Sequence, residues 1–111
     1  MCGIVGYIGK DDALINLKSK IKLLEYRGYD SSGLCLIDSK TNNFYIKKTV
    51  GTIDNIKDLK KIESSVGISH TRWATHGKIN EKNAHPQLSQ DSMISIAVSY
   101  THLTLPTIYS V

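Results

Sequence analysis

The cysteine directly after Met1 is the residue of this chain best suited to chemistry. Removal of Met1 would leave the thiol of Cys2 and a free α-amino group on the same residue. An α-amine has a pKa of about 7.7 to 8.0 and a free thiol about 8.5, so the amine can take the thiol proton near neutral pH. The pair predicts nucleophilic attack on an acyl carbon without a second residue as base. The competing interpretation is a small buried hydrophobe, because free cysteines are among the most buried residues.

Other side chains capable of chemistry gather in the polar stretch of residues 71–92. It contains Arg72, the single tryptophan Trp73, and the histidines His76 and His85. Irregular segments longer than about 12 to 15 residues in a compact domain are usually functional or disordered. Disordered segments have few aromatic residues, which does not fit this composition. We therefore expect a binding loop here.

A zinc site is the main alternative use of these residues. Cys2 could act as a ligand together with His70, His76 and His85. The chain lacks, however, the paired cysteines or the helical histidine pair found in typical zinc sites. We expect no metal and no other cofactor.

The apolar pattern predicts an α+β arrangement that would position Cys2 at the start of a buried strand. Asp11 or Asp12 would cap the first helix, and Gly28 would end it. The expected strands are 3–8, 34–37, 44–50, 66–70 and 93–98, and the expected helices are 12–26 and a shorter one that turns Ile56, Leu59 and Ile62 inward.

Composition excludes several classes of function. The chain has 111 residues, 41% of them apolar and 22% charged, which is typical of a globular domain. The net charge of +4 comes from scattered lysines without an arginine-rich or aromatic stripe, so we expect no nucleic-acid partner. No segment approaches the roughly 20 apolar residues of a membrane span, and no signal peptide is recognisable, so we expect a cytoplasmic protein without a membrane partner. Both cysteines should then stay free, with Cys35 in the core.

Four sequence blocks resemble one enzyme family. They are CGIVGYIG at 2–9, LEYRGYDSSG at 24–33, HTRWATHG at 70–77 and NAHP at 83–86. In this order they closely resemble the glutaminase domain of glutamine-fructose-6-phosphate aminotransferases, which are type-2 glutamine amidotransferases. Amidophosphoribosyltransferases are the alternative within that class, but they tend to have Gln-Glu where this chain has Tyr29 and Asp30.

The resemblance implies a fold and a reaction. The fold would be a four-layer αββα sandwich of the N-terminal nucleophile hydrolase type, incomplete in this chain. The Cys2 thiolate would attack the side-chain amide of glutamine and release ammonia for the conversion of fructose 6-phosphate to glucosamine 6-phosphate. The complete enzyme would be a homo-oligomer.

The resemblance also implies roles for individual residues. Arg72 would bind the α-carboxylate of glutamine, a role suited to a planar, permanently charged group. The residues expected to shape the glutamine pocket are Trp73, Thr75, His76 and Gly77, and those expected to support the nucleophile are Arg27 and Gly28. Without the resemblance, Trp73 would be read as a core residue, Thr75 as a turn residue and His76 as a solvated loop histidine. We expect His85 to be structural.

The chain departs from the family after Val98. The family continues with His-Asn-Gly, whose Asn side chain and Gly amide form an oxyanion hole, whereas this chain has Ser99, Tyr100 and Thr101. All 24 charged residues lie before residue 92. We therefore expect residues 1–98 to be the N-terminal part of a glutamine amidotransferase domain and residues 99–111 to be an uncharged tail foreign to it. The sugar-phosphate isomerase domain would also be missing, and the alternative from another class is an inactive fragment acting at most as an interaction module.

Overall fold

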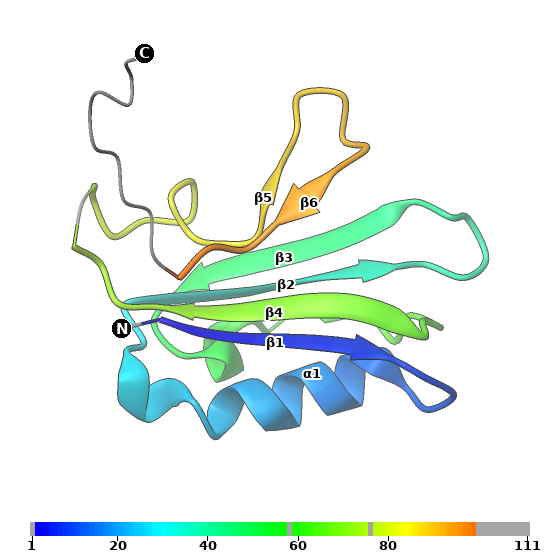
Figure 1. The fold of residues 1–111 in the computed structure, drawn as a ribbon, viewed down its shortest axis with the longest axis horizontal. Helices are drawn as coiled ribbons and strands as arrows, with labels where there is room; N and C mark the ends of the chain where they lie inside the picture. The colour runs from blue at the N-terminus through cyan, green and yellow to red at the C-terminus, as the bar shows by residue number, and fades with distance from the viewer. Residues whose placement is uncertain (1, 58, 76, 100–111) are drawn as a thin grey trace, which may run out of the picture.

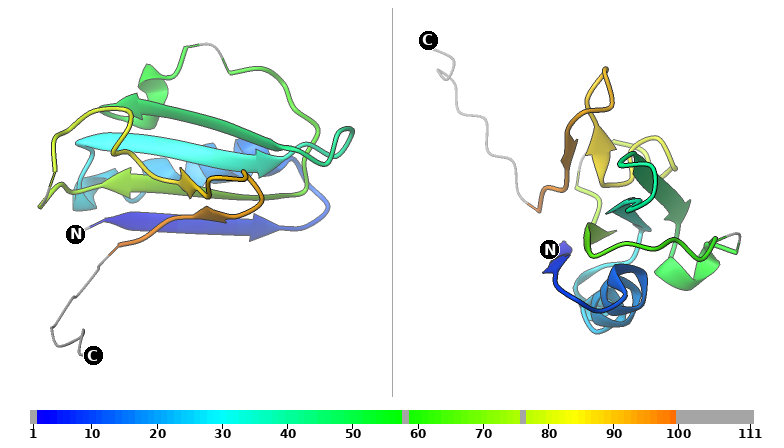
Figure 2. Two further views of the ribbon diagram at one scale, coloured as in Figure 1. Left: turned by 90° about the horizontal axis from the view of Figure 1, so that it is seen from above. Right: turned by 90° about the vertical axis from the view of Figure 1, so that its right-hand side faces the viewer.

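A computed structural model describes residues 2–57, 59–75 and 77–99, which form an antiparallel sheet between a helix and a small hairpin (Figure 1). The main sheet has the strand order β1-β4-β2-β3. Its strands are β1 (Gly3–Ile8), β2 (Ser31–Ile37), β3 (Phe44–Val50) and β4 (Val66–Arg72). The other elements are α1 (Ala13–Lys22), the 3-10 turns η1 (Glu25–Arg27) and η2 (Ile53–Asn55), and the hairpin strands β5 (Gln87–Leu88) and β6 (Ser95–Ile96). The end-on view in Figure 2 separates the helix, the sheet and the hairpin, which confirms the expected α+β class.

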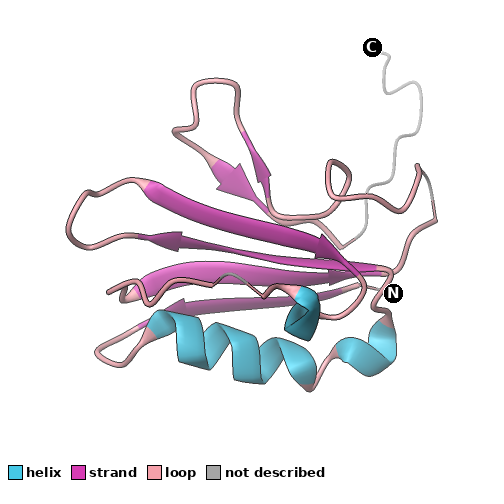
Figure 3. Ribbon diagram, turned by 180° about the vertical axis from the view of Figure 1, so that it is seen from behind, coloured by secondary structure: helices cyan, strands magenta, loops and turns pink. Residues whose placement is uncertain are grey.

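The first helix begins where the sequence predicts and ends earlier. The Asp12 side chain accepts hydrogen bonds from the backbone N–H groups of Leu14 and Ile15, which are otherwise unpaired at a helix start. Leu17 and Ile21 are fully buried against the sheet, so the predicted apolar face is confirmed. After Lys22 the chain turns through Leu23 and Leu24 into η1, and Gly28 ends that turn. Figure 3 shows α1 running along the sheet and the short helical turns beside it.

The predicted helix around Ile56 to Ile62 is wrong. The described residues there have no regular structure after η2, although Ile53 and Ile56 are buried and Leu59 and Ile62 pack against the core. A seven-residue helix is marginal in water, so contacts with distant residues decide the backbone path. The Glu25 carboxylate accepts the Ile53 N–H at 3.2 Å, and the Tyr45 hydroxyl accepts the Lys60 N–H at 3.0 Å.

Three strand boundaries also differ from the prediction. Strand β2 begins at Ser31, three residues before the predicted start at residue 34. Strand β4 continues through Thr71, which pairs with Gly3, and through Arg72, which pairs with Ser31. The predicted loop is therefore shorter than residues 71–92, and it also contains β5. The last predicted strand, 93–98, is reduced to Ser95 and Ile96, which pair with the two-residue strand β5.

Gly33 lets the irregular segment before β5 pack directly on the sheet. A Cβ at Gly33 would lie 2.2 Å from the His85 carbonyl oxygen. We expect Gly33→Ala to lower the free energy of unfolding by about 1–3 kcal/mol, the usual cost of overpacking, measured by urea denaturation. Gly6→Ala is the matched control, because a Cβ at Gly6 would meet nothing within 4 Å. Equal stability of the two variants would contradict the close approach.

Candidate functional site

Cys2 lies just before β1, at the end of the sheet where β4 finishes (Figure 1). Its side chain is only 7% exposed. Gly3 pairs with Thr71, so extending the register by one residue sets Cys2 opposite Arg72. The Trp73 backbone N–H donates to Cys2 Sγ over 3.3 Å, and Sγ lies 3.8 Å from the Trp73 carbonyl oxygen. The Trp73 N–H therefore points at the sulfur. A thiolate at Cys2 would accept this hydrogen bond more strongly than a thiol.

The backbone around Trp73 is fixed by the segment that leads into β2. Gly28 has a φ of 143°, and a Cβ there would lie 2.7 Å from the Cβ of Trp73. The Thr71 hydroxyl donates to the Gly28 carbonyl oxygen over 2.5 Å. The backbone of Trp73, which contacts the sulfur, is thus packed against Gly28. Any other residue at position 28 would be strained.

Asp30 is a site residue for which the sequence suggested no role. Its carboxylate accepts the Ala74 N–H at 2.9 Å, and its backbone N–H donates to the Arg72 carbonyl oxygen at 2.8 Å. These two bonds flank Trp73 on both sides and so hold the peptide that contacts Cys2. Asp side chains in turns tend to accept hydrogen bonds from nearby backbone N–H groups, and this was the only sequence signal for Asp30. That tendency concerns neighbours in sequence. It could not identify Ala74, which is 44 residues away.

Arg72 is the last residue of β4 and not a loop residue. Its side chain is buried, and Nη1 donates to the Lys78 carbonyl oxygen over 3.0 Å. Gly77 has a φ of 81°, and a Cβ there would lie 3.4 Å from Arg72 Nη2. The structure therefore brings Gly77 to the guanidinium end of the Arg72 side chain.

The remaining predicted site residues are less enclosed. The Trp73 side chain is 52% exposed and Thr75 is exposed, so neither is part of the core. Arg27 ends η1 and is half-buried. His76 lies outside the described residues. Within residues 2–57, 59–75 and 77–99, no group of three or more His, Cys, Asp or Glu side chains could hold a metal ion.

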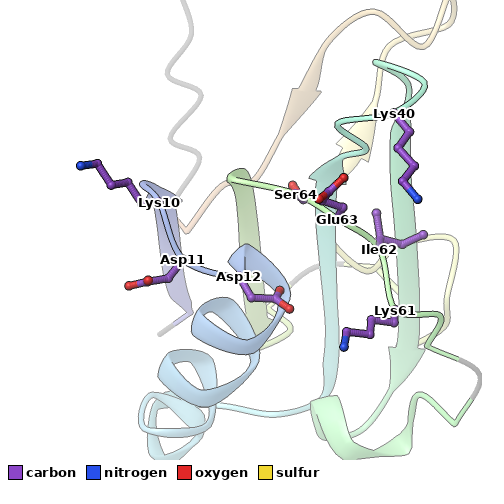
Figure 4. A pocket seen from close by; sticks show the side chains of 8 residues that line it. All are labelled: Lys10, Asp11, Asp12, Lys40, Lys61, Ile62, Glu63 and Ser64. Carbon is purple, nitrogen blue, oxygen red and sulfur yellow. The ribbon is translucent and has the colours of Figure 1, made fainter.

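Cavities alone do not identify this site. A cavity of about 450 Å³ lies at the opposite end of the sheet, where β1 and β2 end and β4 begins (Figure 4). Its lining mixes cationic and acidic side chains: Lys10, Asp11, Asp12, Lys40, Lys61, Ile62, Glu63 and Ser64. A second cavity, of about 410 Å³, lies between α1 and the edge strand β1. Neither contains a predicted site residue, so the chemistry of the side chains decides the assignment.

Sequence comparison connects this site with a group of enzymes. A glutamine–fructose-6-phosphate aminotransferase [isomerizing] of Bacteroides thetaiotaomicron is 49% identical over 98 residues, which is 86% of this chain. The chain is related to these aminotransferases. The enzyme of that name from Caldanaerobacter subterraneus is 44% identical over 99 residues, and that of Buchnera aphidicola is 45% identical over 97 residues. The chain spans only 16% of the length of each of these aminotransferases.

No protein-family profile matches the chain. None of the helices in the described part of the chain has the length and apolar character of a membrane span.

Proposed function

We propose that this chain is the start of the glutamine-hydrolysing part of a glutamine-fructose-6-phosphate aminotransferase. The observation that carries the proposal is the Cys2 thiol, held by the Trp73 peptide opposite the buried Arg72. The relatives with this name at 44–49% identity support it. In the complete enzyme, the ammonia would serve the conversion of fructose 6-phosphate to glucosamine 6-phosphate in the cytoplasm.

The proposed reaction uses the residues around Cys2 in two steps. Once Met1 is removed, the α-amine of Cys2 takes the thiol proton, and Sγ attacks the side-chain amide carbon of glutamine. The amide nitrogen leaves as ammonia after it receives a proton from the α-ammonium group. A water molecule then attacks the thioester, which yields glutamate and restores the thiol. The Trp73 N–H is placed to stabilise the thiolate before the attack.

The other residues would bind glutamine or support the nucleophile. We propose Arg72 for the α-carboxylate, because the residue is buried at the end of β4 that lies beside Cys2 and its charge is permanent. The proposed pocket residues are Trp73, Thr75, His76 and Gly77, and the proposed supports of the nucleophile are Arg27, Gly28 and Asp30.

We propose a four-layer sandwich for the complete domain. In the described residues, α1 covers one face of the sheet and the β5–β6 hairpin only part of the other. On that second face, Ile4 and Ile37 are partly exposed and Ile8 is 82% exposed. A second sheet from the rest of the domain would bury these side chains. The sugar-phosphate isomerase domain and the homo-oligomer are further expectations for the complete enzyme.

Arg72→Lys tests the glutamine site. In a chain completed with a family-like continuation, we expect the substitution to weaken binding of glutamine by about tenfold or more, because an ammonium cannot form two parallel hydrogen bonds. Binding is measured as protection of Cys2 by glutamine against a diazoketone analogue of glutamine. The control is the rate with iodoacetamide, an uncharged reagent, which should stay the same. Unchanged protection would assign Arg72 a structural role.

A further inference from the structure

Two stacked histidines contact both backbone polar groups of one residue, Val98. The Val98 carbonyl oxygen lies 2.9 Å from His70 Nε2, and the Val98 N–H donates to His85 Nδ1 over 3.3 Å. The imidazole rings lie 4.7 Å apart between centroids, with an angle of 29° between their planes. His70 is part of β4, whereas His85 lies in the segment that packs on Gly33. The contact therefore ties the sheet and the hairpin segment to Val98, the second residue after β6.

These contacts determine where the protons are. A carbonyl oxygen only accepts, so His70 Nε2 must carry a proton. His85 Nδ1 accepts the Val98 N–H and must be unprotonated, so a neutral His85 carries its proton on Nε2. His70 Nδ1 is buried, and no partner for it occurs among the described residues. A proton on that nitrogen would be a buried unpaired charge, which is strongly unfavourable.

The residue that follows Val98 contacts the backbone of Cys2. The Ser99 hydroxyl lies 3.5 Å from the Cys2 carbonyl oxygen. Release of Val98 would free its neighbour Ser99 from this contact with the backbone of Cys2.

We infer that His70 and His85 are positioning residues of the nucleophile site, because together they hold Val98 and so place residue 99 against Cys2. The inference rests on the proposed function only for the role of Cys2 as nucleophile. A hydrogen-bond donor in the segment after Val98 could stabilise the oxyanion that forms during attack by Cys2. Its position would depend on where residue 99 is held.

The histidine pair makes the placement sensitive to acid. Burial lowers the pKa of His70 to about 4, and burial also lowers the pKa of His85 below its usual value. The positive charge of Arg72 also lowers the pKa of both histidines, that of Lys48 lowers the pKa of His85, and a charged His85 lowers the pKa of His70. The Glu81 carboxylate favours the charged form of Lys48. Because the unfolded chain takes up protons below about pH 6.5 while the folded chain does not, stability should fall as the pH drops from about 6.5 toward 4. Protonation of His85 Nδ1 then removes the acceptor for Val98.

Nuclear magnetic resonance of the full chain tests the proton positions. We expect ring-nitrogen shifts at pH 7.5 to show the Nε2–H form for both His70 and His85. We expect exchange of the Val98 amide, corrected for intrinsic rates, to accelerate as the pH falls below the pKa of His85. A proton on Nδ1 of His85 at pH 7.5 would overturn the inference even if no variant folds.

Paired substitutions test the positioning role itself. His85→Asn keeps an acceptor close to the place of Nδ1, and His85→Leu has none; His70→Gln keeps a donor, and His70→Leu has none. We expect each Leu variant to accelerate Val98 amide exchange and the reaction of Cys2 with iodoacetamide by about fivefold, the factor produced by loss of one hydrogen bond. The Asn and Gln variants should stay within about twofold of the parent chain. Peptide mapping separates Cys2 from Cys35.

The outcomes distinguish this inference from the proposed function. Faster Val98 exchange with an unchanged Cys2 rate, or equal effects of the Leu variants and their polar partners, would overturn the positioning role. Failure of a diazoketone analogue of glutamine to label Cys2 would instead argue against the proposed function. That result would leave the proton positions and the Val98 contacts as they are.

Discussion

Retaining Met1 should abolish the reaction of Cys2 with a diazoketone analogue of glutamine. Insertion of a lysine between Met1 and Cys2 prevents removal of the methionine and moves the free amine away from the thiol carbon. A general base contributes about 10²- to 10⁴-fold to such a step, so we expect a loss of at least about a hundredfold. The rate of labelling is measured by mass spectrometry of the peptide that contains Cys2.

The control for this experiment is the second thiol. Cys35 is 2% exposed, and burial raises its pKa, so it should remain unlabelled in both chains. Cys35→Ser should therefore label as fast as the parent chain, whereas Cys2→Ser should not label. Labelling of Cys35, or an equal rate in the extended chain, would show that the α-amine is not the base.

Replacement of residues 99–111 by a family-like continuation should raise glutamine hydrolysis by about a hundredfold or more. One oxyanion-hole donor is worth about 10²–10³ in turnover, and the family places an Asn side chain and a Gly amide after the position of Val98. Ser99 already lies beside Cys2, so the residues that follow Val98 are the ones that would provide such donors. The residues from 92 onward contain no Asp, Glu, Lys or Arg, in contrast to the first 91. We therefore propose that residues 99–111 are foreign to the domain.

Ammonia release from glutamine measures this effect in the parent and the completed chain. A chain in which residues 99–111 are replaced by glycine and serine alone is the matched control, since it removes the tail without adding the Asn side chain. We expect this control to stay as slow as the parent chain. Hydrolysis by the parent at the rate of the completed chain would show that the tail belongs to the domain and that the proposed site is incorrect.

Local sequence patterns determined the elements whose causes are local. The apolar run of residues 3–8 forms β1 with Cys2 in front of it, and the cap at Asp12 starts α1. The hairpin of β2 and β3 forms at the predicted place, with Asn42 at a φ of 60° in its turn. In each case residues within a few positions of one another supply the apolar face, the cap or the turn, so short-range preferences are sufficient.

The candidate site is only partly predictable, because distant residues as well as local ones position its side chains. The sequence placed Cys2 at the start of a strand and selected Arg72, but it put Arg72 in a loop. Strand β4 extends to Arg72 because Ser31, 41 residues earlier in the chain, pairs with it. The resemblance to a known family supplied the roles of the site residues, which single-sequence patterns do not contain.

The tertiary structure alone decided which distant groups meet around the nucleophile. Asp30 reaches Ala74, and His70 and His85 together hold Val98, although no local pattern connects these residues. The path of the chain after η2 is likewise set by Glu25 and Tyr45 from other elements. Buried backbone donors and acceptors must find partners, and where no regular element provides them, side chains that folding brings close take that role.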